Sequence, residues 1–161
     1  MKPIYSLAVL LLSIAACTGD ADSDEARHSE VAARGAEVMP FDLDRSTHVF
    51  ATTGDGGIQT VRSDDDDADQ IELIRAHLKD EAARFARGDF HDPAMIHGDE
   101  MPGMHTLVMG AERLSVTYQD VPRGGEIRYE SSDEDIIAAI HAWFAAQLSD
   151  HGDHAQGARG R

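Results

Sequence analysis

Two residue types that bind transition metals, histidine and methionine, are concentrated in one short segment, residues 91–109. The segment contains three of the nine histidines and four of the six methionines. Imidazole binds copper, zinc, nickel and iron, and thioether sulfur favours Cu(I). The composition therefore predicts a transition-metal site, with copper as the first candidate. Core packing is the alternative, because methionine often fills gaps in a hydrophobic core.

Further histidines lie on the predicted elements that flank this segment. With a helical period of about 3.6 residues, His77 and His141 fall beside the apolar stripes of two helices, and His48 opens a strand. An uncharged imidazole buried without a partner is costly, so these side chains are candidate ligands; satisfied core histidines are the alternative. The predicted metal-ligand set is His48, His77, His97, Met101 and His141, with a copper or zinc ion as the possible cofactor.

Familiar catalytic motifs are absent from the sequence. It contains no Gly-x-Ser-x-Gly elbow, no phosphate-binding glycine loop and no His-Glu-x-x-His helix. His97 beside Asp99 or Glu100 could form an acid–base pair, but one nearby carboxylate is common by chance. His77 and Glu81, four residues apart, have the simpler explanation of a hydrogen bond on a helix surface. We therefore predict no catalytic residue, and enzyme activity stays an open alternative.

An acidic run, Asp64–Asp67, precedes the first of these helices. Calcium is one interpretation, but the run lacks the alternating aspartates and the closing glutamate of a calcium-binding loop. Carboxylates at the start of a helix are also stabilised by the helix dipole. The run therefore predicts a solvated helix N-terminus that needs no ion.

The single cysteine, Cys17, follows a short apolar segment that begins after Lys2. Residues 12–17 (Leu-Ser-Ile-Ala-Ala-Cys) resemble the lipobox of bacterial lipoproteins, in which a peptidase cuts before the cysteine and its sulfur is acylated. The apolar stretch is shorter than the roughly 20 residues of a membrane span. We predict a signal peptide over residues 1–16, a lipid anchor at Cys17 and export to the bacterial envelope. An ordinary cleaved signal and a buried helix are the alternatives, and Thr18 favours the outer membrane, facing the periplasm.

Lipidation would leave the mature chain without a thiol, which excludes disulfides, cysteine nucleophiles and thiolate metal sites. The formal net charge of the chain is −16. Such a surface repels phosphate backbones and anionic headgroups, so nucleic acid and peripheral lipid are not expected as partners. The expected partners are the membrane, through the lipid anchor, and a metal ion; the sequence identifies no protein partner.

The elements that must position these side chains form two similar units. Each contains a β-hairpin with a glycine-rich turn, an acidic helix start and an amphipathic helix. The first unit runs from His48 to a helix that ends before Gly88, and the second from Leu114 to Leu148. Two such units predict an α+β fold, in which a four-stranded antiparallel sheet carries two helices on one face. The proline- and glycine-rich segment between the units is predicted to be a loop.

The length of 161 residues suits a single folded domain. Residues 17–29 are polar and acidic, and we predict that they form a tether that begins at the lipidated cysteine. The domain is expected over residues 30–152, opening with a short helix before Pro40. The glycine-rich residues 153–161 are predicted to be a flexible tail.

Several stretches within residues 30–152 resemble a small bacterial family of exported proteins and lipoproteins, often carried under the name aspartate carbamoyltransferase. True aspartate carbamoyltransferases have two α/β domains and a Ser-Thr-Arg-Thr phosphate loop, whereas here Ser46-Thr47 is followed by His48. The resemblance therefore implies no catalytic residue. It implies that the five candidate ligands lie in matching motifs, while Met104 and His105 are often apolar in the family. The stretches that carry it are residues 30–35, 38–42, 47–50, 74–78, 96–103, 141–147 and 149–152, of which 97–103 is the most distinctive.

These observations support one main function and two alternatives. The main prediction is an envelope lipoprotein that binds a transition metal, with copper first, for tolerance or delivery. The first alternative is a non-catalytic interaction module whose histidines are core and surface residues. The second is a small hydrolase or transferase, which needs a pocket that contains His97 beside a carboxylate.

Overall fold

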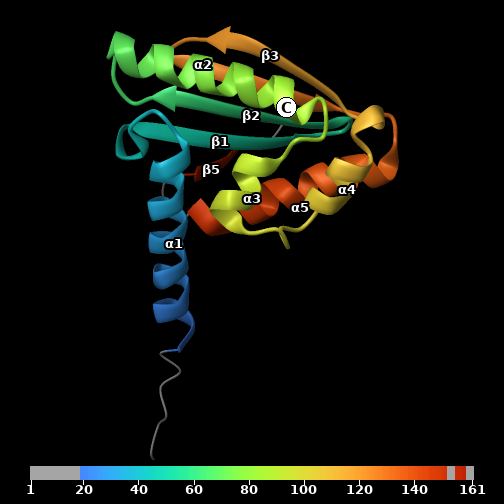
Figure 1. Cartoon of the computed structure of the whole chain (residues 1–161), viewed down its shortest axis with the longest axis horizontal. Coiled ribbons are helices and arrows are strands. Elements are labelled where there is room, and N and C mark those ends of the chain that lie inside the picture. Colours follow the sequence, from blue (N-terminus) through green and yellow to red (C-terminus); the bar gives the residue numbers. More distant parts are fainter. Residues whose placement is uncertain (1–18, 152–154, 159–161) are drawn as a thin grey trace, which may run out of the picture.

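The structure is a computed structural model that describes residues 19–151 and 155–158. Figure 1 shows two long helices, α2 and α5, against one sheet, with α1 standing out from the body of the domain. The predicted α+β class is confirmed. In chain order the elements are α1 (Gly19–Val38), η1 (Leu43–Arg45), β1 (Ser46–Thr53), β2 (Gly56–Ser63), α2 (Ala68–Phe85), α3 (His91–His97), α4 (Met104–Met109), η2 (Ala111–Arg113), β3 (Ser115–Val121), β4 (Gly124–Glu130), α5 (Glu134–His151) and β5 (Ala155–Ala158).

The sheet has five strands in the order β3-β4-β2-β1-β5. The two hairpins, β1–β2 and β3–β4, join through an antiparallel pairing of β2 with β4. The expectation of four antiparallel strands misses β5, which pairs in parallel with β1, so that Ala155 lies opposite His48. Ladder hydrogen bonds come from the backbone, so the small, glycine-containing segment 155–158 can pair without the β-branched residues that usually mark a strand.

The turn of each hairpin contains a residue with positive φ. Gly56, at the start of β2, has a φ of 149°, and a Cβ there would come within 2.1 Å of the Tyr129 carbonyl oxygen. A side chain would therefore prevent β4 from pairing with β2. In the second hairpin Arg123 takes this role with a φ of 61°, after Pro122.

Helices α2 and α5 lie on the same face of the sheet. Tyr129 of β4 shows this directly, because its ring contacts Phe85 of α2 and both Trp143 and Phe144 of α5. All four side chains are at most 1% exposed. This aromatic cluster forms the centre of the core, and three of the candidate ligands, His48, His77 and His97, line a cavity together with Phe85 and Trp143.

The segment between the two units forms two short helices, α3 and α4, and the expectation of a loop is wrong. Pro93 falls in the first turn of α3, where a missing backbone N–H does no harm. Glycines separate the helices: Gly98 has a φ of 92° and Gly103 a φ of 81°. A Cβ on Gly103 would lie 2.1 Å from the carbonyl oxygen of Ala139 in α5, so this glycine permits close packing.

Helix α1 begins at Gly19 and so includes much of the segment expected as a tether. It packs against α3 and α5. Arg34 donates to the carbonyl oxygen of Ile96, and His28 hydrogen-bonds the carbonyl oxygen of Ser149. Across residues 19–151 and 155–158, no helix has the length and apolar character of a membrane span. The predicted signal peptide and Cys17 lie outside the described residues.

Candidate functional site

Four histidines from different parts of the chain line one small cavity between the sheet, α2, α3 and α5. The volume of this cavity is about 20 Å³, which suits one water molecule or one ion. Aromatic and aliphatic side chains form much of the wall. The polar and sulfur-containing side chains that line it are Met39, His48, Gln59, His77, Glu81, His97, Gln147 and His151. We call this space the histidine cavity.

A chain of charged hydrogen bonds from Arg27 through Asp150 ends at His97. Its Nδ1 lies 2.8 Å from Oδ2 of Asp150, and Arg27 of α1 holds both oxygens of that carboxylate at 2.7 Å. The His97 side chain is 1% exposed and that of Asp150 is 8% exposed. Burial opposes the charge on Asp150, but hydrogen bonds from Arg27 and His97 outweigh it and hold its pKa below the usual range.

The same contact fixes the protonation of His97. An ionised Asp150 accepts a hydrogen bond, so Nδ1 of His97 carries the proton and Nε2 keeps a lone pair when the ring is neutral. Burial, helped by the positive charges of Arg27 and Arg34, lowers the pKa of His97, and together they outweigh the opposite effect of Asp150. At neutral pH the imidazole is therefore uncharged, in the form that binds metals.

Three imidazoles follow one another at the cavity. The ring centroid of His97 lies 4.9 Å from that of His151, which lies 5.5 Å from that of His48. Both contacts are edge-to-face, with interplanar angles of 80° and 81°. His151 also hydrogen-bonds Gln147 through Nε2 at 3.0 Å. One helix end, one short helix and one strand thus supply adjacent imidazoles.

Two of the residues that line the cavity have a buried polar atom without a hydrogen-bond partner, Nε2 of His77 and Nε1 of Trp143. The nearest carboxylate oxygen to His77, Oε1 of Glu81, is 3.6 Å from Nε2. These two side chains are 10% and 8% exposed. Burial lowers the pKa of His77, but the nearby carboxylates of Glu81 and Asp92 together more than compensate, so the pKa is raised. Unsatisfied buried atoms are uncommon and often mark the place of a water or an ion.

The structure brings together three of the five predicted ligands and separates the other two from them. His48, His77 and His97 line the histidine cavity. Met101 is 6% exposed and packs in the hydrophobic core. His141 is bonded through Nε2 to the carbonyl oxygens of Thr53 at 3.0 Å and Gly56 at 2.9 Å, so it fastens α5 to the first hairpin. It does not line the cavity.

Sequence reasoning missed several residues that complete the site. His151 lies at the very end of α5, beside residues expected to be a tail, and Met39 lies outside the histidine- and methionine-rich segment. Asp150 approaches His97 only in the folded chain, 53 positions away in sequence. The spacing of Gln147 and His151, four residues apart on a helix, was the one local signal for part of this group.

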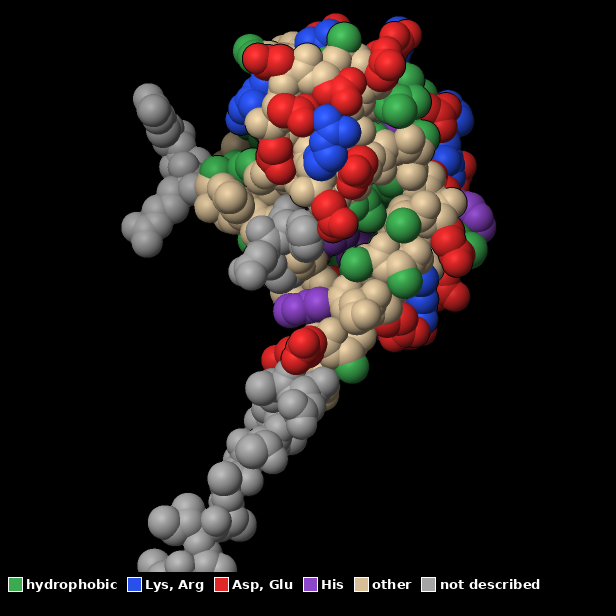
Figure 2. Space-filling view, turned by 90° about the vertical axis from the view of Figure 1, so that its left-hand side faces the viewer, with side chains coloured by type: hydrophobic (Ala, Val, Ile, Leu, Met, Phe, Trp, Pro, Cys, Tyr) green, Lys and Arg blue, Asp and Glu red, His purple; other side chains and the backbone are tan. Residues whose placement is uncertain are grey.

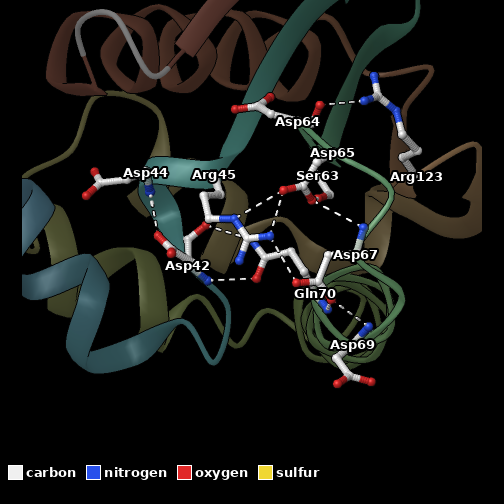
Figure 3. Close-up of polar contacts among 10 residues, drawn as sticks. All are labelled: Asp42, Asp44, Arg45, Ser63, Asp64, Asp65, Asp67, Asp69, Gln70 and Arg123. Atoms are coloured by element: carbon white, nitrogen blue, oxygen red, sulfur yellow. Dashed lines mark hydrogen bonds and ion pairs between the residues drawn. The ribbon is translucent and has the colours of Figure 1, made fainter.

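In the acidic run, unlike in the histidine cavity, the charged side chains contact one another and the start of α2 (Figure 3). Arg45 donates to Asp65 at 2.6 Å and to Asp67 at 2.9 Å, so these carboxylates already face a cation. Asp67 also accepts from the backbone N–H groups of Asp69 and Gln70 and caps α2. The contacts of this run account for it as a helix start.

Within the described ranges, no three side chains among His, Cys, Asp and Glu are already arranged as a ligand set for a metal ion. The imidazoles of the histidine cavity are neighbours, but their rings do not all point to one centre. On the face shown in Figure 2, acidic side chains are widespread, and histidines are visible both at the surface and set back between other side chains.

Comparison with protein-family models, with curated proteins and with solved structures found no match for this chain. Inference about function therefore rests on the geometry and chemistry of the histidine cavity.

Proposed function

We propose that the chain is a bacterial envelope lipoprotein that binds one transition-metal ion, copper or zinc, in the histidine cavity, for metal tolerance or delivery. His48, His97 and His151 are the proposed ligands. The observation that carries the proposal is the succession of these three imidazoles, with centroids 4.9 and 5.5 Å apart.

This spacing is the one that coordination requires. Metal–nitrogen bonds of about 2.0 Å in a tetrahedral site place the centroids of two bound imidazoles roughly 5 Å apart. We expect the three rings to turn toward a common ion mainly by rotation about their own side-chain bonds. The χ2 torsion of histidine has broad minima, so such rotation is inexpensive.

The surroundings of His97 also fit a ligand. Metal-bound histidines usually donate their second ring N–H to a carboxylate, which orients the ring and increases its basicity. Asp150 is the carboxylate that accepts from Nδ1 of His97, and Arg27 holds Asp150 in position. The lowered pKa of His97 means that protons compete with the ion only at acidic pH.

The size and lining of the cavity favour an ion over an organic substrate. A space of about 20 Å³ holds one small species, so a hydrolase or transferase reaction has no room for its substrate there. Met39 also lines the cavity and adds a thioether to the imidazoles. That combination suits copper in particular.

Titration of the purified full-length chain in detergent with Cu(I), Cu(II) and Zn(II) tests the proposal. We expect one ion per chain, and His97→Ala should weaken its binding by at least about 100-fold. His105→Ala is the matched control, because His105 is exposed on α4 and should leave the affinity unchanged. Absence of binding for all three ions would refute the proposal and favour the interaction module.

The envelope location rests on the lipobox-like residues 12–17 and has its own test. Cells fed a labelled fatty acid should incorporate it into the chain, and Cys17→Ser should abolish the label. An unlabelled wild-type chain would contradict the lipid anchor without bearing on metal binding.

A further inference from the structure

A second and larger space, which we call the outer cleft, shares lining residues with the histidine cavity. It offers about 270 Å³ between α1, η1, the start of β1 and the end of α5. His48 and His151 line both spaces, and Asp150 lines the cleft. A molecule in the outer cleft would therefore contact two of the proposed ligands.

The outer cleft has the chemical character of a site for a cationic or neutral molecule with an apolar body. One part of its wall is apolar, formed by Val31, Ala32 and Leu43. Carboxylates of Glu25 and Asp44 lie elsewhere on the wall, and no Lys or Arg is among the described residues that line it. An anionic guest would lose its hydration near these carboxylates without finding a countercharge.

The two spaces differ in what they can hold. The histidine cavity has room for a single ion, whereas the outer cleft approaches the roughly 300 Å³ at which small-molecule sites begin. An ion bound at His48 and His151 could therefore keep an organic co-ligand, with the ion on the inner side and the organic part in the cleft.

We propose that this protein receives its metal as a small cationic or neutral chelate, whose organic part occupies the outer cleft. This inference rests on the proposed metal-binding function. In the binding step, imidazole nitrogens of His48, His97 and His151 replace three water ligands of the chelated ion, and the three waters leave to solvent. No electron is transferred, and the bonds between ion and chelator stay intact.

The test compares two copper chelates with opposite charge. The probes are the one-to-one Cu(II) complexes of 2,2′-bipyridine, which is dicationic and aromatic, and of nitrilotriacetate, which is anionic. The full-length chain in detergent is mixed with each and separated from small molecules by gel filtration. We expect bipyridine to elute with protein and copper in equal amounts, and nitrilotriacetate to be absent from the protein fraction.

Substitutions then locate the chelator. Ala32→Trp should fill the cleft and weaken binding of the bipyridine complex by about tenfold or more, while uptake of aqueous Cu(II) is retained. Ala33→Trp, an exposed neighbour on α1 outside the cleft lining, is the control. Glu25→Lys should also weaken binding of the cationic complex, and Glu37→Lys, exposed on the same helix, should not.

The outcomes separate this inference from the function on which it rests. Copper that binds while bipyridine is released, or equal effects of Ala32→Trp and Ala33→Trp, would overturn the chelate proposal and leave the metal site standing. Failure to bind aqueous copper or either complex would overturn both.

Discussion

The acidic cluster at the start of α2 and the histidine cavity are both rich in ionisable side chains, but they differ in how those side chains are satisfied. In the acidic cluster, Asp65 and Asp67 accept hydrogen bonds from Arg45, and Asp67 also caps the helix. In the histidine cavity, Nε2 of His77 and Nε1 of Trp143 are buried without partners. In the acidic cluster these carboxylates have hydrogen-bond partners within the protein. In the histidine cavity, two residues that line a space of the size of one ion have a polar atom without a partner.

This difference shows why a run of like residues is a poor guide to a site. The acidic run is conspicuous in sequence, yet Asp64, Asp65 and Asp67 already accept hydrogen bonds from Arg45, from two hydroxyl groups and from the start of α2. The histidines are scattered, and they meet only because β1, α3 and the end of α5 converge. Unsatisfied burial, rather than local abundance, distinguishes the candidate site.

Substitution of Asp150, which joins Arg27 to His97, should have the largest effect on stability and metal affinity. Asp150→Asn removes the charge that pairs with Arg27 and orients His97. Because the Arg27 side chain is 48% exposed, solvent screens this ion pair, and we expect a loss of about 1 to 2 kcal/mol in unfolding free energy. Metal affinity should fall by about 10- to 100-fold. Urea unfolding and metal titration measure the two losses. Asp69→Asn, at an exposed position in the acidic cluster, is the control, and equal effects at both positions would erase the contrast between the regions.

A smaller effect is expected from the acidic cluster itself. Asp67→Ala removes the cap of α2, which should lower the unfolding free energy by about 1 kcal/mol. Metal affinity should stay unchanged, because the cluster lies outside the histidine cavity. Calorimetric binding beside thermal unfolding checks both statements, and weakened metal binding in this variant would place the ion at the acidic run instead.

An opposite sign is expected for the unpartnered imidazole. His77→Met keeps much of the side-chain volume and removes a buried nitrogen that has no hydrogen bond, so the apo-protein should gain up to about 1 kcal/mol in unfolding free energy. Urea unfolding without metal measures the gain. A clear loss of stability would mean that Nε2 of His77 is satisfied in solution, and the proposed distinction would weaken.

The smallest expected effect is on how the unfolding free energy depends on pH. Because burial depresses the pKa of folded His97, the unfolded chain binds a proton more readily than the folded chain as the pH falls below about 6.5. His97 therefore reduces stability as the pH falls through this range, whereas His77, with its raised pKa, adds stability below about 6.5. His97→Gln should therefore make stability less sensitive to acid. Unfolding curves of wild type and variant at several pH values measure the difference, and parallel curves would contradict the pKa direction.

The sequence predicted those parts of the fold that depend on local pattern. Glycine turns located both hairpins, and apolar stripes located α2 and α5. It failed where tertiary contacts decide: α3 and α4 form despite glycines that suggested a loop, and residues 155–158 become a strand because β1 offers a free edge.

The candidate site was predictable to a similar degree. His48, His77 and His97 could be chosen because burying an imidazole is costly, and the cavity unites them. His141 shares the same sequence signal but satisfies it with two backbone carbonyls. Nothing in the local sequence distinguishes these fates, and nothing local links Asp150 to His97.

The docking of α1 has a mechanical consequence for a lipid-anchored protein. Its 20 residues extend about 30 Å, and Arg27 joins the helix to the carboxylate behind His97. With a lipid on Cys17, two positions before the helix begins, the height of the cavity above the bilayer would be set by a rod instead of a loose chain. A partner would then find the proposed metal site at a nearly constant distance from the membrane. Tilting of α1 would act directly on the Arg27–Asp150 ion pair that orients His97.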